Sequence, residues 1–278
     1  MSTASTYHQS AGIELHLGDA LQVLCGLAAR SVDCVVTSPP YWGHRDYGVV
    51  GQYGQEERVE DFVEVLRDLF AEVRRVLKPS GTCWLNLGDS YGGSWGNYVA
   101  VGSTAPTAGD EVRRRRHGTH RPPQSRVLRK SLIGVPWRVA LAMQEDGWLL
   151  RNSIVWHKPN ARPESVRDRL GTRYESVFFF AMSKDHYFVP ALSPLGDVWS
   201  VPTQSFRGHT AVGPVEIARR AIELGCPQGG VVLDPFSGTA TTGLAARQLG
   251  RSYVGVDLNR AFHDLAIARF ARQEEGSR

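Results

Sequence analysis

The sequence predicts an α/β fold with a doubly wound, mostly parallel sheet. Segments that alternate like strands and segments with the 3.6-residue period of helices follow one another through most of the chain. The chain has 278 residues, of which 42% are hydrophobic and 22% charged, enough for one large domain with a sizeable core. We therefore expect a single domain over residues 1–278, without an internal repeat.

The first third of the chain predicts three strands and two helices. Residues 13–17 alternate between apolar and polar side chains, and residues 32–37 form a dense β-branched run that two prolines end. From residue 59 to residue 77, apolar side chains recur at helical spacing, and a Lys-Pro-Ser-Gly stop follows. The predicted strands are 13–17, 32–37 and 82–87, and the predicted helices are 21–27 and 59–77.

Residues 92–130, which we call the basic insertion, are rich in Gly, Ser, Thr, Pro and Arg and show neither period. This composition predicts a long, mobile insertion. The chain has a net charge of +4, but the window from Val112 to Gln144 holds nine Lys and Arg and no acidic residue. That window is +9, which leaves −5 for the rest. A concentrated basic segment on an acidic-leaning body favours a polyanionic partner, and a solvated loop without a ligand is the alternative.

The second half of the chain returns to regular alternation. A cap at Lys130-Ser131 opens an amphipathic period, and two later apolar runs predict strands that lie close together in the sheet. The predicted helices are 131–147, 214–224, 241–249 and 259–273, and the predicted strands are 149–156, 176–182, 231–233 and 253–256.

The composition argues against a membrane protein, an exported protein and a metal centre. No apolar stretch approaches the roughly 20 residues that a spanning helix needs, and the polar first twelve residues lack a signal-peptide core. The cysteines form no CxxC pair and predict neither a zinc site nor a disulfide framework. We expect a cytoplasmic protein whose thiols are buried, at Cys25, Cys34, Cys83 and Cys226.

Residues 231–243, Val-Val-Leu-Asp-Pro-Phe-Ser-Gly-Thr-Ala-Thr-Thr-Gly, run from an apolar strand through an acidic turn into a helix. Doubly wound sheets bind nucleotides at such a turn, although this is not the GxGxxG fingerprint. Asp257 ends the next predicted strand, where a carboxylate can accept both ribose hydroxyl protons. A turn that starts with Asp234 and lacks a phosphate-binding lysine favours a nucleoside with a cationic amine, such as S-adenosylmethionine. A generic strand–turn–helix junction is the alternative.

The strand at 32–37 runs into Ser-Pro-Pro-Tyr-Trp at residues 38–42. Because the prolines have no N–H donors, the Ser38 hydroxyl and the carbonyls of Ser38 and Pro39 form an array of acceptors beside Tyr41. Such an array suits the exocyclic amine of a planar base stacked on the tyrosine. Acceptors that hold the amine hydrogens aim its lone pair at an electrophile, so that alignment supplies most of the rate. A proline-rich structural turn is the alternative.

Together, Ser38–Trp42 and Asp234–Gly238 resemble the motifs of the amino-group DNA methyltransferases that use S-adenosylmethionine. The catalytic motif precedes the cofactor motif, as in the circularly permuted β group of that family. The resemblance spans almost the whole chain and implies a Rossmann-like methyltransferase fold with this permuted motif order. Further segments similar to the family lie at 17–21 (adenine contact), 154–160 and 163–169 (flanks of the base pocket), and 197–199 and 209–214 (before the cofactor strand).

The resemblance implies a role for each matching residue. Ser38 and the Pro39 carbonyl would bind the target amine, and Tyr41, after Pro40, would stack on the flipped base. Two positions depart from the family pattern: Ala240 replaces a glycine, and Gly213 replaces a bulky aromatic. The cofactor residues would be Asp234, Phe236, Gly238 and Thr239 at the methionine end, Asp257 at the ribose and Asp19 at the adenine amine.

Serine in the first motif position, with tryptophan after the tyrosine, resembles the cytosine-N4 members more than the adenine-N6 members. The resemblance therefore implies methyl transfer to the N4 amine of a cytosine flipped out of duplex DNA, with adenine N6 as the alternative. The absence of a Pro-Cys dipeptide argues against carbon-5 methylation. A catalytically silent DNA-binding regulator and an RNA or protein-amine methyltransferase are less favoured hypotheses.

DNA as the polyanion gives the basic insertion a task, namely phosphate contacts that become ordered when DNA binds. Residues 158–208 would form the target-recognition and base-pocket loops, where arginine fits guanine edges. A restriction endonuclease acting on the same site would be a further partner. We expect Trp156 to be core or pocket wall, His157 a packing or hydrogen-bonding residue, and Glu175 strand core. The candidate DNA contacts are Arg113, Arg114, Arg115, Arg116, Arg121, Arg167 and Arg169.

Overall fold

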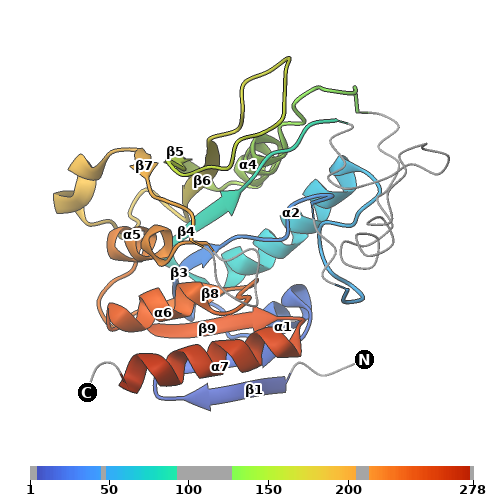
Figure 1. Cartoon of the computed structure of the whole chain (residues 1–278). Helices are drawn as coiled ribbons and strands as arrows, with labels where there is room; N and C mark the ends of the chain where they lie inside the picture. The colour runs from blue at the N-terminus through green and yellow to red at the C-terminus, as the bar shows by residue number, and fades with distance from the viewer. Residues whose placement is uncertain (1–4, 45–47, 93–126, 205–212, 276–278) are drawn as a thin grey trace.

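The computed structural model describes residues 5–44, 48–92, 127–204 and 213–275, which form one nine-stranded sheet with helices on both faces (Figure 1). The strand order is β1-β2-β9-β8-β3-β4-β6-β5-β7. The strands are β1 (Ser5–Ser10), β2 (Ile13–Leu17), β3 (Val32–Thr37), β4 (Leu77–Leu87), β5 (Leu149–His157), β6 (Tyr174–Ala181), β7 (Val198–Ser200), β8 (Val231–Asp234) and β9 (Ser252–Asp257).

The centre of the sheet is parallel. Strands β2, β9, β8, β3 and β4 run in the same direction, whereas β1 and β6 are antiparallel to their neighbours. Strand β7 adds a short parallel pairing with β5 at the far edge. The predicted doubly wound, mostly parallel α/β fold is confirmed, and so is the predicted neighbourhood of β5 and β6.

Two apolar cores cover the two faces of the sheet. On one face, α2 contributes seven buried residues and packs with α1 and α4; on the other, α5, α6 and α7 pack together. The two helix layers lie on opposite sides of the strands in Figure 1. The helices are α1 (Ala20–Gly26), α2 (Val59–Val76), α4 (Val135–Glu145), α5 (Val215–Gly225), α6 (Thr241–Gln248) and α7 (Arg260–Glu275), with a 3-10 helix η1 at Pro190–Leu195.

Some predicted boundaries were wrong. Helix α2 ends at Val76, next to the predicted Lys-Pro-Ser-Gly stop, but strand β4 begins at Leu77, five residues before its predicted start. The helix predicted from residue 131 begins at Val135, because Gly134 has the left-handed φ of +76° and interrupts the period. The Asp89 carboxylate accepts hydrogen bonds from the Gly134 and Val135 N–H groups at 3.0 Å and so caps α4. Strands β1 and β7 carry no clear alternation and were not predicted.

The two described ends of the basic insertion meet. The Gly92 N–H donates to the Ser131 carbonyl at 2.8 Å, and the Lys130 N–H donates to the Gly92 carbonyl at 2.6 Å. Tyr91 and Leu132 form an isolated antiparallel bridge beside them. Residues 93–126, between these ends, lie outside the described residues.

The cysteine prediction was wrong for one of the four. Cys34, Cys83 and Cys226 are buried thiols, but Cys25 is exposed, because it lies on the face of the short helix α1 that points away from the core. Among the described residues, no helix is both long and apolar enough to cross a membrane.

Candidate active site

The Ser-Pro-Pro-Tyr motif follows the most central strand of the sheet. All six residues of β3 are buried, and β3 pairs with β8 on one side and β4 on the other. Ser38, directly after the strand, is exposed, whereas Pro39 is buried and Pro40 half-buried. The rigid prolines therefore present the Ser38 hydroxyl at the carboxyl edge of the parallel strands.

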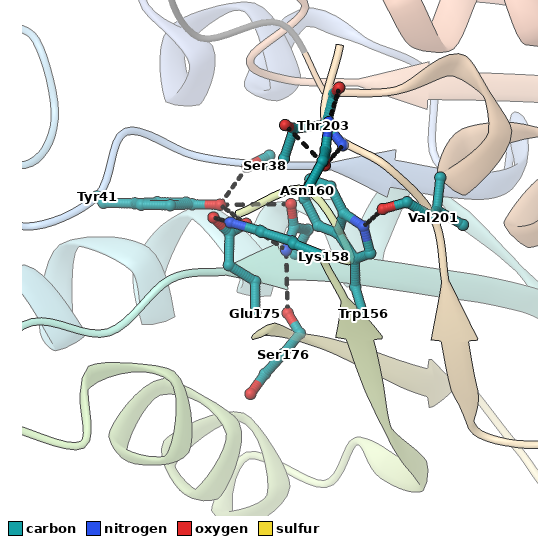
Figure 2. Close-up of polar contacts among 10 residues, drawn as sticks. Ser38, Tyr41, Trp156, Lys158, Asn160, Glu175, Ser176, Val201 and Thr203 are labelled. Atoms are coloured by element: carbon teal, nitrogen blue, oxygen red, sulfur yellow. Dashed lines mark hydrogen bonds and ion pairs between the residues drawn. The ribbon is translucent and has the colours of Figure 1, made fainter. Parts of the chain in front are cut away.

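The Tyr41 hydroxyl is the centre of a polar cluster (Figure 2). It donates to Glu175 Oε2 at 2.7 Å and lies 3.3 Å from Asn86 Oδ1, while the Ser38 hydroxyl donates to it at 3.4 Å. The Tyr41 ring packs against Gly88, where an added Cβ would lie 2.5 Å from the ring. The hydrogen bonds hold the hydroxyl end of the Tyr41 ring, and the absence of a side chain at Gly88 leaves room for the ring. Both features therefore set the orientation of the ring.

Glu175 was predicted as strand core, and this prediction was wrong. Its carboxylate forms an ion pair with Lys158, and both side chains are 17% exposed. The ammonium of Lys158 also lies 4.7 Å from the centroid of the Trp156 ring, and Asn86 Nδ2 donates to Glu175 Oε2 at 3.2 Å. The pair forms because Trp156 is opposite Glu175 in the β5–β6 register and Lys158 follows two residues later. An acidic residue in an otherwise apolar strand was the available signal, since charged residues are seldom buried unpaired.

The two residues before Lys158, Trp156 and His157, have the packing and hydrogen-bonding roles that the sequence predicted. Trp156 is 5% exposed and donates from Nε1 to the Val201 carbonyl at 2.8 Å. His157 Nδ1 lies 3.1 Å from the Ser200 hydroxyl. Both contacts attach β5 to the segment around β7 and leave Lys158 directed toward the motif.

Asp234 ends β8 and turns its carboxylate into the protein. Oδ1 accepts from the Thr37 hydroxyl at 2.7 Å and from the Phe236 N–H at 3.1 Å, and Oδ2 accepts from the Thr242 hydroxyl at 2.8 Å. The residue is only 4% exposed. Burial raises the pKa of Asp234 to about 6, although the hydrogen bonds from Thr37 and Thr242 oppose that shift. Asp234 thus joins β8, β3 and the following helix α6.

The turn after Asp234 brings Gly238 and Asp257 together. Gly238 has a φ of +49°, and its N–H donates to Asp257 Oδ2 at 2.8 Å, while the Asn259 N–H donates to Oδ1 at 2.7 Å. Burial raises the pKa of Asp257 to about 6 against these two hydrogen bonds. Ala240 also adopts a left-handed φ, +57°, which explains why a glycine suits this position.

Tyr53, which the sequence did not single out, lies between Asp19 and Phe236 and interacts with both. Asp19 caps α1 by accepting from the Gln22 N–H at 3.0 Å. Tyr53 packs edge-on against Phe236, with ring centroids 5.0 Å apart, and burial together with the Asp19 carboxylate raises the pKa of its hydroxyl. Tyr53 lies in an aperiodic glycine-rich loop, so no pattern could have revealed it.

Thr239 is held by a helix on the far side of the turn. It is buried, and Arg269 of α7 donates to its hydroxyl at 2.8 Å. The structure therefore brings Asp234, Phe236, Gly238, Thr239, Asp257 and Asp19 to the same edge of the sheet as the Ser38 motif.

Comparison with known proteins identifies the family. Residues 32–268 match the profile of the N6_N4_Mtase family, a DNA methylase family. The chain belongs to this DNA methylase family. The Type II methyltransferase M.SmaI of Serratia marcescens is 43% identical over 274 residues, covering 92% of this chain and 90% of that protein. M.Cfr9I of Citrobacter freundii, also a Type II methyltransferase, is 42% identical over 275 residues, covering 95% and 89%.

Solved structures share the fold of this DNA methylase. The PvuII DNA methyltransferase, described as cytosine-N4-specific, superposes with a TM-score of 0.70 at 18% identity, covering 96% of this chain and 87% of that one. A Thermus thermophilus protein described as a "putative DNA modification methylase", solved in complex with S-adenosyl-L-methionine, gives a TM-score of 0.64 at 28% identity, with 93% of each chain covered.

The candidate DNA contacts of the methylase divide into three cases. Arg167 is exposed, on the loop between β5 and β6. Arg169 is held in place, because it donates to Glu164 at 2.7 Å and its guanidinium lies 3.9 Å from the centroid of the Tyr91 ring. A further ion pair, between Lys130 and Asp168, links this loop to the end of the basic insertion. The other candidates, Arg113, Arg114, Arg115, Arg116 and Arg121, lie outside the described residues.

Proposed function

We propose that this DNA methylase transfers a methyl group from S-adenosylmethionine to the exocyclic N4 amine of a cytosine flipped out of duplex DNA. The observation that carries the proposal is the pairing of β3 with β8, which sets the exposed Ser38 hydroxyl beside the turn that follows Asp234. Catalysis of this kind needs an amine held by acceptors next to an electrophile. A neutral serine in the first position of the motif supports cytosine N4 over adenine N6.

The residues at the carboxyl ends of β2, β8 and β9 fit S-adenosylmethionine. Asp257 is half-buried, so its carboxylate can accept from ribose hydroxyls while the N–H groups of Gly238 and Asn259 hold it in place. Asp19 would accept from the adenine amine, and Phe236 and Thr239 would line the methionine end. When bound, the cofactor supplies an electrophilic methyl group; the protein's part is to align the amine and to exclude water.

The wider setting follows from the relatives. The Type II methyltransferases that this chain resembles support a modification enzyme paired with a restriction endonuclease for the same site. The order of the strands in the chain, with β3 before β8, supports the circularly permuted β group. Activity on the DNA of the host cell would place the enzyme in the cytoplasm.

The test is transfer of a labelled methyl group from S-adenosylmethionine to duplex DNA, followed by digestion to nucleosides. We expect N4-methylcytosine from the wild-type chain and none from Ser38→Ala, which should keep its cofactor affinity. Asp257→Ala should mainly weaken cofactor binding. Ser80→Ala, at an exposed serine near the amino end of β4, is the matched control and should react like wild type.

Three results would contradict parts of this proposal. Labelled N6-methyladenine would replace the proposed base while leaving the enzyme class intact. Transfer to RNA but not to duplex DNA would exclude DNA as the substrate. An equal loss of cofactor affinity in Ser38→Ala and Asp257→Ala would contradict the separate roles of the two sites.

A further inference from the structure

The Ser38 hydroxyl is connected to a mostly buried carboxylate, Glu175, that lies outside the Ser-Pro-Pro-Tyr motif. Ser38 donates to Tyr41, and Tyr41 donates to Glu175 Oε2. Glu175 comes from β6 and its counter-ion Lys158 from the end of β5, so the chain of contacts joins three separate segments of the fold (Figure 2).

The chemistry of the groups fixes the direction of these hydrogen bonds. An ionised carboxylate only accepts, so the single Tyr41 proton goes to Glu175 at 2.7 Å rather than to Asn86 at 3.3 Å. The Tyr41 oxygen is then left to accept, and Ser38 donates its own proton to it. Both lone pairs of the Ser38 oxygen are consequently available as acceptors.

We propose that Glu175 is a positioning residue for methyl transfer: acting through Tyr41, it holds the Ser38 hydroxyl with its lone pairs toward the target amine, and it receives the proton that the amine releases. This inference rests on the proposed function. A carboxylate at the end of a hydrogen-bonded chain polarises each donor along it, which makes the serine oxygen a stronger acceptor. The negative charge that a neutral serine lacks is thus supplied two hydrogen bonds away.

Bonds and protons balance in the proposed methyl transfer. The amine nitrogen forms a bond to the methyl carbon while the carbon–sulfur bond breaks, and the sulfur keeps that electron pair. The nitrogen then carries one proton too many. That proton passes to the Ser38 oxygen, the Ser38 proton to the Tyr41 oxygen and the Tyr41 proton to Glu175, which ends the step as a neutral carboxylic acid.

Lys158 is the counter-ion of Glu175 and fixes which carboxylate oxygen faces Tyr41. Its ammonium, 4.7 Å from the centroid of the Trp156 ring, contacts Glu175 Oε1 and leaves Oε2 for Tyr41. The ammonium compensates for the hydration that a mostly buried carboxylate loses. Asn86 Nδ2 adds a hydrogen bond to the same oxygen as Tyr41, at 3.2 Å.

The experiment is a double-mutant cycle of Glu175→Gln and Tyr41→Phe, measured as single-turnover methyl transfer to duplex DNA. We expect Glu175→Gln to lower the rate by about tenfold to a hundredfold, with the KM for DNA and the cofactor affinity within about threefold of wild type. The Tyr41→Phe variant already lacks the hydrogen bond from Tyr41 to Glu175. Adding Glu175→Gln to it should therefore lower the rate by less than about a further threefold. Asp146→Asn, which breaks the remote ion pair with Arg67, is the matched control and should leave the rate unchanged.

Two results would overturn the inference. One is a Glu175→Gln rate within threefold of wild type; the other is a double variant whose loss equals the product of the two single losses. If Glu175→Gln does not fold, Glu175→Asp keeps the charge and should retain more activity than Glu175→Ala; equal activities would also overturn it. Because the wild-type chain is the reference, a wild type that methylates DNA separates failure of this inference from failure of the proposed function.

Discussion

The Thr37 hydroxyl donates a hydrogen bond to Asp234 Oδ1 at 2.7 Å, across 197 residues of sequence. Thr37 ends the strand that leads to Ser38, and Asp234 ends the strand that leads to the cofactor turn. Both side chains are buried, at 3% and 4% exposure, so the contact is shielded from water. It fixes the position of one motif relative to the other, which a methyl transfer between the two sites requires.

Thr37→Val tests that contact. Valine has nearly the same shape but no donor, so the buried carboxylate loses one partner, and the free energy of unfolding should fall by about 1.5–3 kcal/mol. The measurement is urea denaturation at pH 7. Thr6→Val, at an exposed position of the edge strand β1, is the control and should change stability by less than about 0.5 kcal/mol. Equal effects of the two substitutions would show that the hydrogen bond contributes nothing.

The raised pKa values of Asp234 and Asp257 predict a pH dependence of stability. Both are about 6 in the folded protein against an ordinary value of 3.8, because burial disfavours the charged forms. Between about pH 4 and pH 6 the folded chain therefore binds more protons than the unfolded chain. Raising the pH through this window lowers the free energy of unfolding, by roughly 2 kcal/mol for Asp234, and above the window this contribution is constant.

Asp234→Asn isolates the contribution of one carboxylate, because asparagine does not titrate. The variant is less stable overall, since its amide replaces an acceptor, but its stability should fall less steeply than that of wild type between pH 4 and pH 6. Denaturation curves at half-unit steps of pH measure the difference in slope. Parallel curves for the two proteins would contradict a pKa of Asp234 near 6.

Gly88→Ala tests the packing of the Tyr41 ring. An added Cβ would lie 2.5 Å from Tyr41 Cε2, so the ring must move. We expect methyl transfer to slow by about tenfold or more, since small displacements of an aligned group are costly, while cofactor affinity stays unchanged. Gly26→Ala is the control: it ends α1, its Cβ would meet nothing within 4 Å, and its rate should equal that of wild type. A Gly88→Ala rate like that of the control would exclude this packing as a determinant.

The parts of the site that follow from the sequence are those with a local signal. Residues 32–37 are rich in β-branched side chains, and two prolines follow Ser38, so the strand and its end at Ser38 could be predicted from neighbouring residues alone. The pairing of β3 with β8 is not local and was not predicted; the preference of parallel α/β folds predicted only that the turn after Asp234 lies at the carboxyl end of its strand.

The parts that could not be predicted depend on long-range register. Glu175 reaches Tyr41 only because β6 lies between β4 and β5. The sequence predicted that β5 and β6 are neighbours, but nothing in residues 174–181 specifies β4 as the other neighbour. Asp89 lies two residues past the predicted strand 82–87, and no local pattern shows that it caps a helix 46 residues later in the chain. Tyr53 has neither period nor motif, and its contact with Phe236 arises only in the folded chain.

The last prediction concerns the basic insertion as the DNA-binding segment. Because Gly92 and Lys130 are hydrogen-bonded to each other, residues 93–126 can be replaced by a short Gly-Ser linker without separating the ends that remain. The deletion removes six arginines: Arg113–Arg116, Arg121 and Arg126. DNA affinity should fall, and the slope of log K against log salt should flatten by about 0.9 for each phosphate that the protein no longer neutralises. Cofactor affinity, which depends on other residues, should not change; binding of DNA and of cofactor across a salt series measures both. A full-length variant with the six arginines changed to glutamine separates charge from length, and an unchanged salt slope in that variant would show that the insertion does not contact DNA phosphates.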